Sequence, residues 1–376
     1  MWSRGAINPG QPGTILTFAA PMRTVPYRIL IVRPSALGDV CRTVPLLAAL
    51  RLHFPEAQID WVVQDSFVDA VRSHPALNSC IPFPRQALRR WWSPTGAARA
   101  VRWALPLRRT RYDLAIDAQG LMRSALICWF SGASRRVGPG NWREGAAPLC
   151  NERVSCAAQH DVERTLALAV RATGAPAIAD MRLTVPPDCR EVWESARATD
   201  GVAAKYAVFA PTSRWPSKQW PDERWVELAR RMLDQGLVES IVVLGAPGEE
   251  SRVARLLAGM PAQCRNFIGR TSVGQAMAAI AGGSVVIGGD SAALHMAVGL
   301  GVPYVALMGP TDSRRVGPWQ GDRWTISGGA PPADPRAYRR SDNSLMARIQ
   351  VVAVLSRVTL AQVSGESFRA TSGGGN

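Results

Sequence analysis

Residues 284–308 read SVVIGGDSAALHMAVGLGVPYVALM, and this stretch decides the class of fold. It begins with a β-branched run at 284–288, continues as an apolar helical pattern at 291–299, and returns to a second apolar run at 304–308. Two strands that are joined through a helix lie parallel, because antiparallel neighbours need only a tight hairpin. The stretch therefore predicts one strand-helix-strand unit of a parallel sheet.

The same alternation extends through most of the chain on both sides of this unit. Further strands are predicted at 28–33, 58–63, 112–117, 135–138, 206–210, 240–244 and 266–269, and further helices at 40–54, 66–73, 121–130, 161–173, 221–235, 249–259 and 273–282. Strict alternation of this kind specifies parallel sheets with helices on both faces. We therefore predict an α/β protein with two doubly wound, Rossmann-like domains that face a central cleft.

The predicted domain boundaries follow the breaks in this alternation. Residues 1–27 carry Gly and Pro where a signal peptide would need an apolar core, and they are expected to form a flexible extension. The two predicted domains comprise residues 28–190 and 191–345. Residues 346–376 are expected to hold a last helix and, from 364 onward, a disordered tail that ends SGGGN.

The composition is that of an ordinary globular chain. Its 376 residues are 47% hydrophobic and 19% charged, which excludes a disordered chain and a coiled coil. No apolar run is long enough to span a bilayer, so we expect a cytoplasmic protein. The seven cysteines include no C-x-x-C pair and the four histidines lie far apart, so we predict neither disulfides nor a metal site.

The chain is basic, and its charge is unevenly distributed. Lys and Arg number 44 against 29 Asp and Glu, a net charge of +15. From Ala70 to Tyr112 there are nine arginines and no acidic residue. This stretch indicates an anionic partner. The alternative is a solvated basic face that serves only solubility.

The loop PSALGD at 34–39 lies between a predicted strand and a predicted helix. It ends in Asp39, where the amides at the start of the helix face the cleft. An acidic residue at this position is informative about function. The alternative is that it only caps the helix.

The loop at 211–221 follows the strand predicted at 206–210 and suits a phosphate. It gathers Thr212, Ser213 and Lys218, whose hydroxyls and ammonium group donate hydrogen bonds to anions. An ordinary polar turn is the alternative.

A third loop, at 288–291, also leads from a strand into a helix, and the free amides of that helix start suit a diphosphate. Asp290 and Ser291 lie there, and His295 follows on the helix. The loop lacks both G-x-G-x-x-G and G-K-[ST], so an ordinary dinucleotide site or P-loop is not predicted.

Taken together, these loops resemble the ADP-heptose:lipopolysaccharide heptosyltransferases, most closely heptosyltransferase I. The match runs in order from about residue 28 to residue 318, and it implies a GT-B fold, in agreement with the two predicted domains. The segments that carry it are RPSALGDVCRTVPLL (33–47), IDWVVQDSF (59–67), YDLAIDAQGLMRSAL (112–126), HDVERTL (160–166), KQWPDERWVEL (218–228), LGAPGEE (244–250) and GDSAALHMAVGLGVPYVALMGPTD (289–312).

The resemblance implies an inverting, metal-independent transfer of heptose from ADP-heptose to the 3-deoxy-manno-octulosonate of lipid A, in the synthesis of the lipopolysaccharide inner core. No cofactor is implied. The implied partners are the ADP-sugar, an anionic lipid A-linked acceptor and the inner membrane surface, with no nucleic acid. Asp39 matches the general base, which takes the proton of the acceptor hydroxyl in such a displacement.

The same resemblance assigns donor binding to the second domain and acceptor binding to the first. At three donor positions the chain departs from the family, with Ala292 in place of the usual Gly, and Ser213 and Ser291 where Thr is common; the methyl group of Ala292 narrows the approach to a phosphate. The donor residues are Thr212, Ser213, Lys218, Glu249, Asp290, Ser291, Ala292 and His295. The acceptor residues are Ser35, Gly38, Arg89, Arg90, Gln119 and Arg123.

Two other interpretations stay open at this point. A relative with the same fold would use another nucleotide sugar or another acceptor. A basic RNA-binding protein would explain the net charge, although no RNP, KH or C₂H₂ pattern is present.

Overall fold

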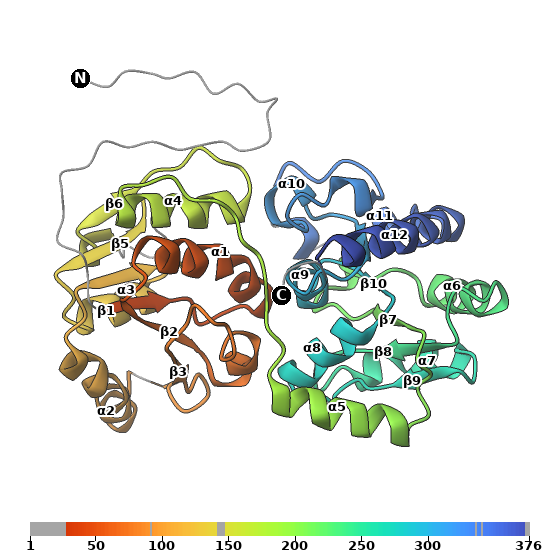
Figure 1. The fold of residues 1–376 in the computed structure, drawn as a ribbon, viewed down its shortest axis with the longest axis horizontal. Coiled ribbons are helices and arrows are strands. Elements are labelled where there is room, and N and C mark those ends of the chain that lie inside the picture. The colour runs from red at the N-terminus through yellow and green to blue at the C-terminus, as the bar shows by residue number, and fades with distance from the viewer. Residues whose placement is uncertain (1–27, 91, 141–146, 335–336, 340, 373–376) are drawn as a thin grey trace.

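The computed structural model describes residues 28–372 except 91, 141–146, 335–336 and 340. The predicted extension at 1–27 and the end of the predicted tail, 373–376, lie outside the described residues. Within the described part, two parallel sheets follow one another along the chain, each with helices on its faces (Figure 1).

The first sheet has six strands in the order β3-β2-β1-β4-β5-β6. These are β1 Arg28–Val32, β2 Gln58–Gln64, β3 Ser79–Phe83, β4 Leu114–Asp117, β5 Arg135–Pro139 and β6 Glu152–Val154. The helices of this domain are α1 Leu37–His53, α2 Pro94–Thr110, α3 Met122–Phe130 and α4 Asp161–Thr173, with a 3₁₀ helix, η1 Asp65–Ala70, after β2.

The second sheet repeats this topology in the order β12-β11-β10-β7-β8-β9. Its strands are β7 Tyr206–Ala210, β8 Ser240–Val243, β9 Cys264–Asn266, β10 Val285–Gly288, β11 Tyr304–Met308 and β12 Thr325–Ser327. The helices around it are α5 Pro187–Thr199, α6 Asp222–Asp234, α7 Ala254–Gly259, α8 Val273–Gly282, α9 Ala292–Gly299, α10 Ser313–Val316, α11 Ser344–Ala347 and α12 Val351–Ser372.

The central strands are buried on both faces, which explains their unbroken apolar sequences. Ile29, Leu30, Ile31 and Val32 of β1 have no exposed surface, and every residue of β7 and β10 is buried. Because side chains alternate between the two faces of a strand, such a strand needs helices on both sides of its sheet. The predicted α/β class with two doubly wound domains is confirmed.

In each sheet the strand order reverses beside the first strand. β1 lies between β2 and β4, and β7 lies between β8 and β10. Sheets of this order bind ligands outside the carboxyl ends of the strands, where the loops diverge at the reversal. The loops after β1, β4, β7 and β10 are therefore where a site is expected.

Several elements differ from the prediction. The strands β6 and β12 have three residues each and lie at sheet edges, so no apolar run marks them. The unpredicted helix α5 starts at Pro187, because Pro is well suited to a first helical turn, and it buries only Cys189 and Trp193. The helix expected at 66–73 is the shorter η1. At the other end, α12 includes much of the predicted tail and packs on α6, β10 and β11.

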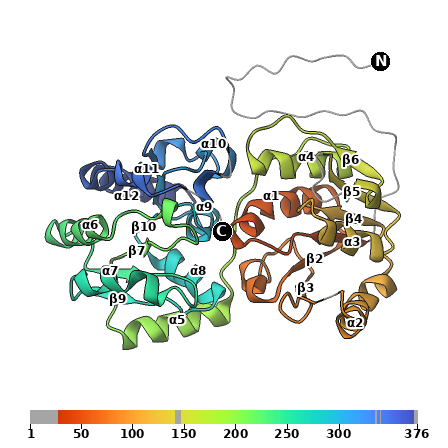
Figure 2. The ribbon, with the colours of Figure 1, turned by 180° about the vertical axis from the view of Figure 1, so that it is seen from behind.

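The two domains touch along α1 and α9, which lie side by side at the centre of the molecule (Figures 1 and 2). A second contact joins η1 to the start of α8, where Asp69 accepts hydrogen bonds from Ser272 Oγ (3.2 Å) and Gly274 N (3.3 Å). The backbone N of Leu183 donates to Gly299 O over 2.7 Å. These contacts hold the ligand-binding edges of the two sheets next to each other.

Candidate active site

Asp39 lies in the first turn of α1, directly after β1. Ala36 is the N-cap residue, and its backbone N donates to Asp39 Oδ2 over 3.2 Å. The capping role weighed from the sequence is therefore present, although Asp39 exerts it from the third helical position. The Asp39 side chain keeps 28% of its surface exposed, so its carboxylate remains open to a further partner.

Two arginines hold the Asp39 carboxylate. Arg33 Nη2 lies 3.2 Å from Oδ2, and Arg42 Nη2 contacts Oδ1. Burial alone would raise the pKa of Asp39, but the two guanidinium groups, together with the hydrogen bond from Ala36 N and the nearby His295, lower the pKa to about 2. Asp39 is therefore ionised at physiological pH, as a proton acceptor has to be.

Arg42 links this carboxylate to the second domain. Its side chain lies on α1 and is only 8% exposed. Nη1 donates to Val316 O over 2.8 Å and lies 2.9 Å from His295 Nε2, and both of these partners belong to the second domain. Nη2 also lies 3.5 Å from Asp161 Oδ2 at the start of α4. The buried guanidinium of Arg42 thus links the Asp39 carboxylate to α4 of the first domain and to the second domain.

His295 faces this junction from α9. Burial, and then the charge of Arg42, lower the pKa of His295 to about 3, so the ring is neutral. A neutral ring that accepts from Arg42 at Nε2 carries its proton on Nδ1. A Cβ added at Gly38 would lie 2.9 Å from His295 Cδ2. The structure therefore brings Gly38, predicted for the acceptor, against His295, predicted for the donor.

In the second domain an ion pair joins the loops after β7 and β10. Lys218 Nζ lies 2.7 Å from Asp290 Oδ2 and 4.2 Å from the centroid of the Tyr338 ring. Burial acts to raise the pKa of Asp290, but Lys218, together with Arg42 and His295, lowers it. Two predicted donor residues, 72 positions apart in the sequence, are thus in direct contact.

Hydroxyl groups lie at the same end of the second sheet. Ser291 Oγ and Thr311 Oγ1, which follow β10 and β11, are buried and have no hydrogen-bond partner among the described residues. Ser291 is the N-cap residue of α9, which begins at Ala292, but its side chain makes no capping bond. Buried hydroxyls without a partner beside a helix start suit an anion.

The remaining predicted donor residues lie on the neighbouring loops. A Cβ added at Gly245 would come 3.1 Å from Thr212 Cγ2, so the loops after β7 and β8 touch. The hydroxyl of Ser213 accepts a hydrogen bond within its own loop. Glu249 Oε2 accepts from Ala246 N over 2.9 Å in the loop after β8. Donor residues from three adjacent strands thus share one edge of the sheet.

In the first domain a cavity of about 250 Å³ opens beside the loop after β1. It brings together three predicted acceptor residues, Ser35, Gln119 and Arg123, and Gln119 Nε2 donates to Ser35 Oγ over 3.4 Å. The Arg123 guanidinium lies 5.8 Å from the centroid of the Phe83 ring. The lining residues are Pro34, Ser35, Gln64, Phe83, Arg85, Gln119, Leu121 and Arg123.

Asp117, at the end of β4, holds one wall of this cavity. Its Oδ1 accepts from the backbone N of Gln119 (2.8 Å) and of Gly120 (2.9 Å), and its Oδ2 accepts from Ser124 Oγ (3.0 Å). The side chain is fully buried, and burial raises the pKa of Asp117 to about 6. Asp117 therefore positions the loop that carries Gln119.

Arg89 and Arg90 do not line this cavity. Both are exposed in the turn between β3 and α2. Arg85, from the same arginine-rich stretch, does line it and donates to Gln64 Oε1 over 3.2 Å.

Several residues of the site were not predicted from the sequence. Arg42 carries a local signal, since it follows Asp39 by one helical turn within an otherwise apolar run. Arg33, which follows β1, shares its loop with the predicted residue Ser35. Thr311, after β11, lies in the segment 289–312 that carries the resemblance but was assigned no role. Nothing in the sequence distinguishes Arg85 from the arginines around it.

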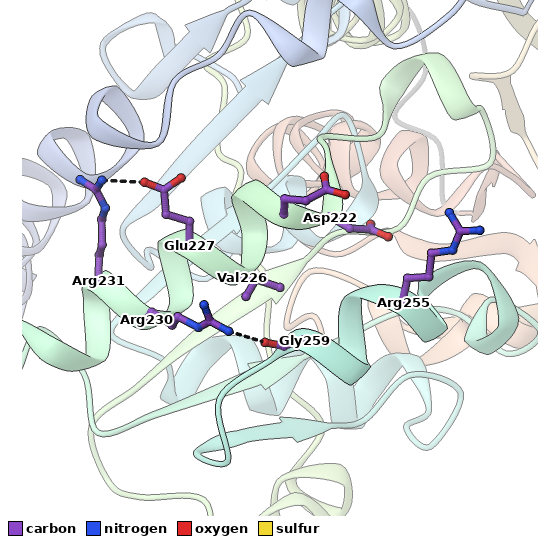
Figure 3. Close-up of a pocket in the computed structure, with 8 residues that line it drawn as sticks. Asp222, Val226, Glu227, Arg230, Arg231, Arg255 and Gly259 are labelled. Atoms are coloured by element: carbon purple, nitrogen blue, oxygen red, sulfur yellow. Dashed lines mark hydrogen bonds and ion pairs between the residues drawn. The ribbon is translucent and has the colours of Figure 1, made fainter.

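A larger cavity, of about 560 Å³, lies away from these residues between α6 and α7 (Figure 3). Two of its arginines interact with nearby groups: Arg231 Nη2 lies 2.6 Å from Glu227 Oε1, and Arg230 Nη2 donates to Gly259 O. Among the described residues no group of three or more His, Cys, Asp or Glu side chains is placed to hold a metal ion. No described helix is long and apolar enough to cross a bilayer.

Comparison with known proteins finds relatives over most of the chain. The model of glycosyltransferase family 9 (heptosyltransferase) matches residues 101–345. Lipopolysaccharide heptosyltransferase 1 of Pseudomonas aeruginosa is 33% identical over 296 residues, which are 76% of this chain and 79% of that protein. Lipopolysaccharide heptosyltransferase 2 of Escherichia coli K12 is 28% identical over 301 residues, 76% of this chain and 83% of that protein.

The same fold is found among solved structures. The E. coli heptosyltransferase WaaC, solved with ADP, has a TM-score of 0.71 and 27% sequence identity to this chain. The similarity covers 89% of this chain and 99% of that one.

Proposed function

The chain belongs to glycosyltransferase family 9, the heptosyltransferases, and from this we propose that it moves heptose from ADP-heptose to the 3-deoxy-manno-octulosonate of lipid A. The observation that carries the proposal is the position of Asp39. This ionised carboxylate lies at the strand-order reversal of the first sheet, beside the helix α9 of the second domain. Asp39 thus lies between the cavity of the first domain that holds predicted acceptor residues and the edge of the second sheet that holds predicted donor residues.

We infer that Asp39 is the general base of an inverting displacement. The acceptor hydroxyl oxygen forms a bond to the anomeric carbon of the heptose, and the bond from that carbon to the diphosphate oxygen breaks. The hydroxyl proton passes to Asp39, and ADP leaves with the electron pair. Attack opposite the leaving group inverts the anomeric centre.

A carboxylate with a pKa of about 2 is a weak base, and the timing of the proton transfer follows from this. A free sugar hydroxyl is far too weak an acid to lose its proton to Asp39. As the hydroxyl oxygen bonds to the anomeric carbon it becomes cationic and strongly acidic, so the proton moves late. Arg33 and Arg42 keep the carboxylate ionised until then.

We infer that the donor diphosphate binds at the start of α9. Lys218 supplies positive charge there, and Ser291 and Thr311 supply hydroxyl donors. Asp290 holds the Lys218 ammonium group in place through its 2.7 Å contact. These groups stabilise the charge that develops on ADP as it leaves.

The acceptor cavity of the first domain supports octulosonate rather than heptose as the sugar that receives the transferred heptose. Arg85 and Arg123 both line it, and arginine binds carboxylates in bidentate geometry. An octulosonate acceptor carries a carboxylate on the sugar that receives the heptose, whereas a heptose acceptor does not.

The proposed function is tested by supplying purified enzyme with ADP-heptose and either lipid A that bears octulosonate or the same acceptor already bearing one heptose. Mass spectrometry should show one heptose added to the first acceptor and little to the second. Preference for the second acceptor would contradict the assignment, and transfer from another nucleotide sugar in preference to ADP-heptose would contradict the proposed donor.

A further inference from the structure

The helix α2 presents an apolar stripe to solvent. Pro94, Ala98, Val101 and Leu105 recur at the spacing of one helical face, and all four are exposed. Val101 keeps 52% of its surface exposed and Leu105 keeps 37%. Trp92, two residues before the helix, is 70% exposed. A surface helix normally turns such a face inward, so this stripe needs another explanation.

The apolar stripe is flanked by positive charge. Arg99, Arg102, Arg108 and Arg109 of α2 are all exposed. No acidic residue occurs anywhere from 70 to 112. An apolar face bordered by arginines, on a helix of low overall hydrophobicity, is typical of helices that lie in the interface of an anionic bilayer.

The opposite face of α2 ties the helix to the acceptor cavity. Ala104 and Leu107 are buried in the core of the first domain. Trp103 Nε1 donates to Pro82 O over 2.8 Å, and the Trp103 ring packs edge-on against Phe83 with 5.2 Å between centroids. Phe83 lines the acceptor cavity. The orientation of α2 therefore fixes how that cavity faces whatever surface the helix binds.

We propose that α2 docks the enzyme on an anionic phospholipid bilayer, with the apolar stripe inserted among the lipids and the arginines on the headgroups. The helix lies at an outer corner of the first domain, away from the second domain, so a flat surface can reach it (Figures 1 and 2). Nucleic acid would satisfy the arginines but would offer nothing apolar to Val101 and Leu105. The proposal rests on the proposed function only in that the acceptor is lipid-linked.

Vesicle binding by the full chain tests the proposal. The protein should sediment with vesicles of phosphatidylcholine mixed with phosphatidylglycerol, but not with vesicles of phosphatidylcholine alone. An arginine near an anionic membrane surface contributes about 1 kcal/mol to the free energy of membrane binding. Arg102→Gln with Arg109→Gln should therefore weaken vesicle binding by at least about tenfold. Val101→Ser with Leu105→Ser should weaken it several-fold. If the serine pair fails to fold, the glutamine pair, which changes only exposed side chains, still decides the test.

Matched controls remove the same groups from the second domain. Arg190→Gln with Arg255→Gln takes away two exposed arginines, and Val352→Ser with Leu360→Ser takes away two exposed apolar side chains. Both control pairs should bind vesicles as the unaltered chain does. Equal loss in control and α2 pairs, no vesicle binding at all, or a salt-sensitive RNA affinity that α2 substitutions abolish would overturn the proposal.

A transfer assay separates this proposal from the proposed function. The two double variants of α2 should keep the kcat/KM of the unaltered chain when the acceptor is soluble and free of detergent. When the acceptor is embedded in vesicles, their kcat/KM should fall by the same factor as their vesicle binding. Normal transfer on vesicles by the α2 pairs would refute docking through α2 and leave the enzyme activity standing. Vesicle binding through α2 without any heptose transfer would support docking and contradict the proposed function.

Discussion

Replacing Arg42 by Met should loosen the second domain although the substitution lies in the first. The guanidinium of Arg42 donates to Val316 O over 2.8 Å and contacts His295 across the domain junction, and it also contacts Asp39 on its own helix. A hydrogen bond from a charged donor contributes about 1.5–3 kcal/mol when it is buried. Met fills similar space but makes none of these contacts, so Arg42→Met isolates the polar part of the junction.

The ion pair adds to this loss. The net fall in the pKa of Asp39 from 3.8 to about 2 corresponds to about 2 kcal/mol, and Arg33, Arg42 and the hydrogen bond from Ala36 N contribute to it against the opposing effect of burial. We therefore expect Arg42→Met to lower the free energy of unfolding by about 2–4 kcal/mol in urea titrations at neutral pH. A carboxylate with a depressed pKa stabilises the fold above its unfolded pKa, and this stabilisation disappears as the pH falls through the folded value. The difference between the two proteins should therefore narrow as the pH falls from 3.8 toward about 2.

Hydrogen exchange provides the sharper assay. Backbone amides of α9 should exchange faster in Arg42→Met. Arg51→Met is a matched control on the same helix, because Arg51 donates only to first-domain groups such as Ala57 O (2.8 Å) and Asn78 Oδ1 (2.6 Å) among its described partners. It should speed exchange near those groups and leave α9 unchanged. Unaltered exchange of α9 in Arg42→Met, or an equal effect of the control, would refute this account of the junction.

Three further predictions concern binding and the meeting of the domains. Lys218→Ala should weaken ADP binding by about 1.5–3 kcal/mol, the range for hydrogen bonds to charged groups, and calorimetry that finds unchanged affinity would refute it. Arg89→Ala with Arg90→Ala removes two exposed charges outside the acceptor cavity, so it should raise the acceptor KM by weakening long-range attraction of the anionic acceptor and leave ADP affinity intact. Added salt should mimic part of the effect, and unchanged acceptor kinetics at low salt would favour a solvated basic face. Gly38→Ala places a methyl group 2.9 Å from His295 Cδ2, so it should lower both stability and turnover, whereas normal turnover would mean that the junction yields easily.

The fold was predictable because its central strands are buried on both faces. A strand such as Tyr206–Ala210 has to be apolar throughout, and this leaves a clear mark in the sequence. The edge strands Glu152–Val154 and Thr325–Ser327 are short and less constrained, so they leave none. The exposed helix α2 was missed for a related reason, since it presents apolar residues on its solvent face as well as on its core face.

Site residues could be predicted where their position follows from neighbouring residues in the sequence. They could not be predicted where their position follows from how the two domains pack together. Asp39 and Ser291 each follow a strand and begin a helix, and this can be read from neighbouring residues. The contact between Arg42 and His295 joins residues 253 positions apart, and no local pattern encodes it. For the same reason His295 was expected to face the donor, and its contact with Arg42 of the first domain was not anticipated.

The most direct test of the central claim is the rate of heptose transfer by Asp39→Asn, measured beside its affinity for ADP. Asp161→Asn is the matched control, because Asp161 also faces Arg42, at 3.5 Å, but lies at the start of α4. If Asp39 is the general base, Asp39→Asn should bind ADP normally and transfer heptose about 10² times more slowly or worse, while Asp161→Asn keeps most of its turnover. Turnover by Asp39→Asn close to that of the unaltered enzyme would contradict the account.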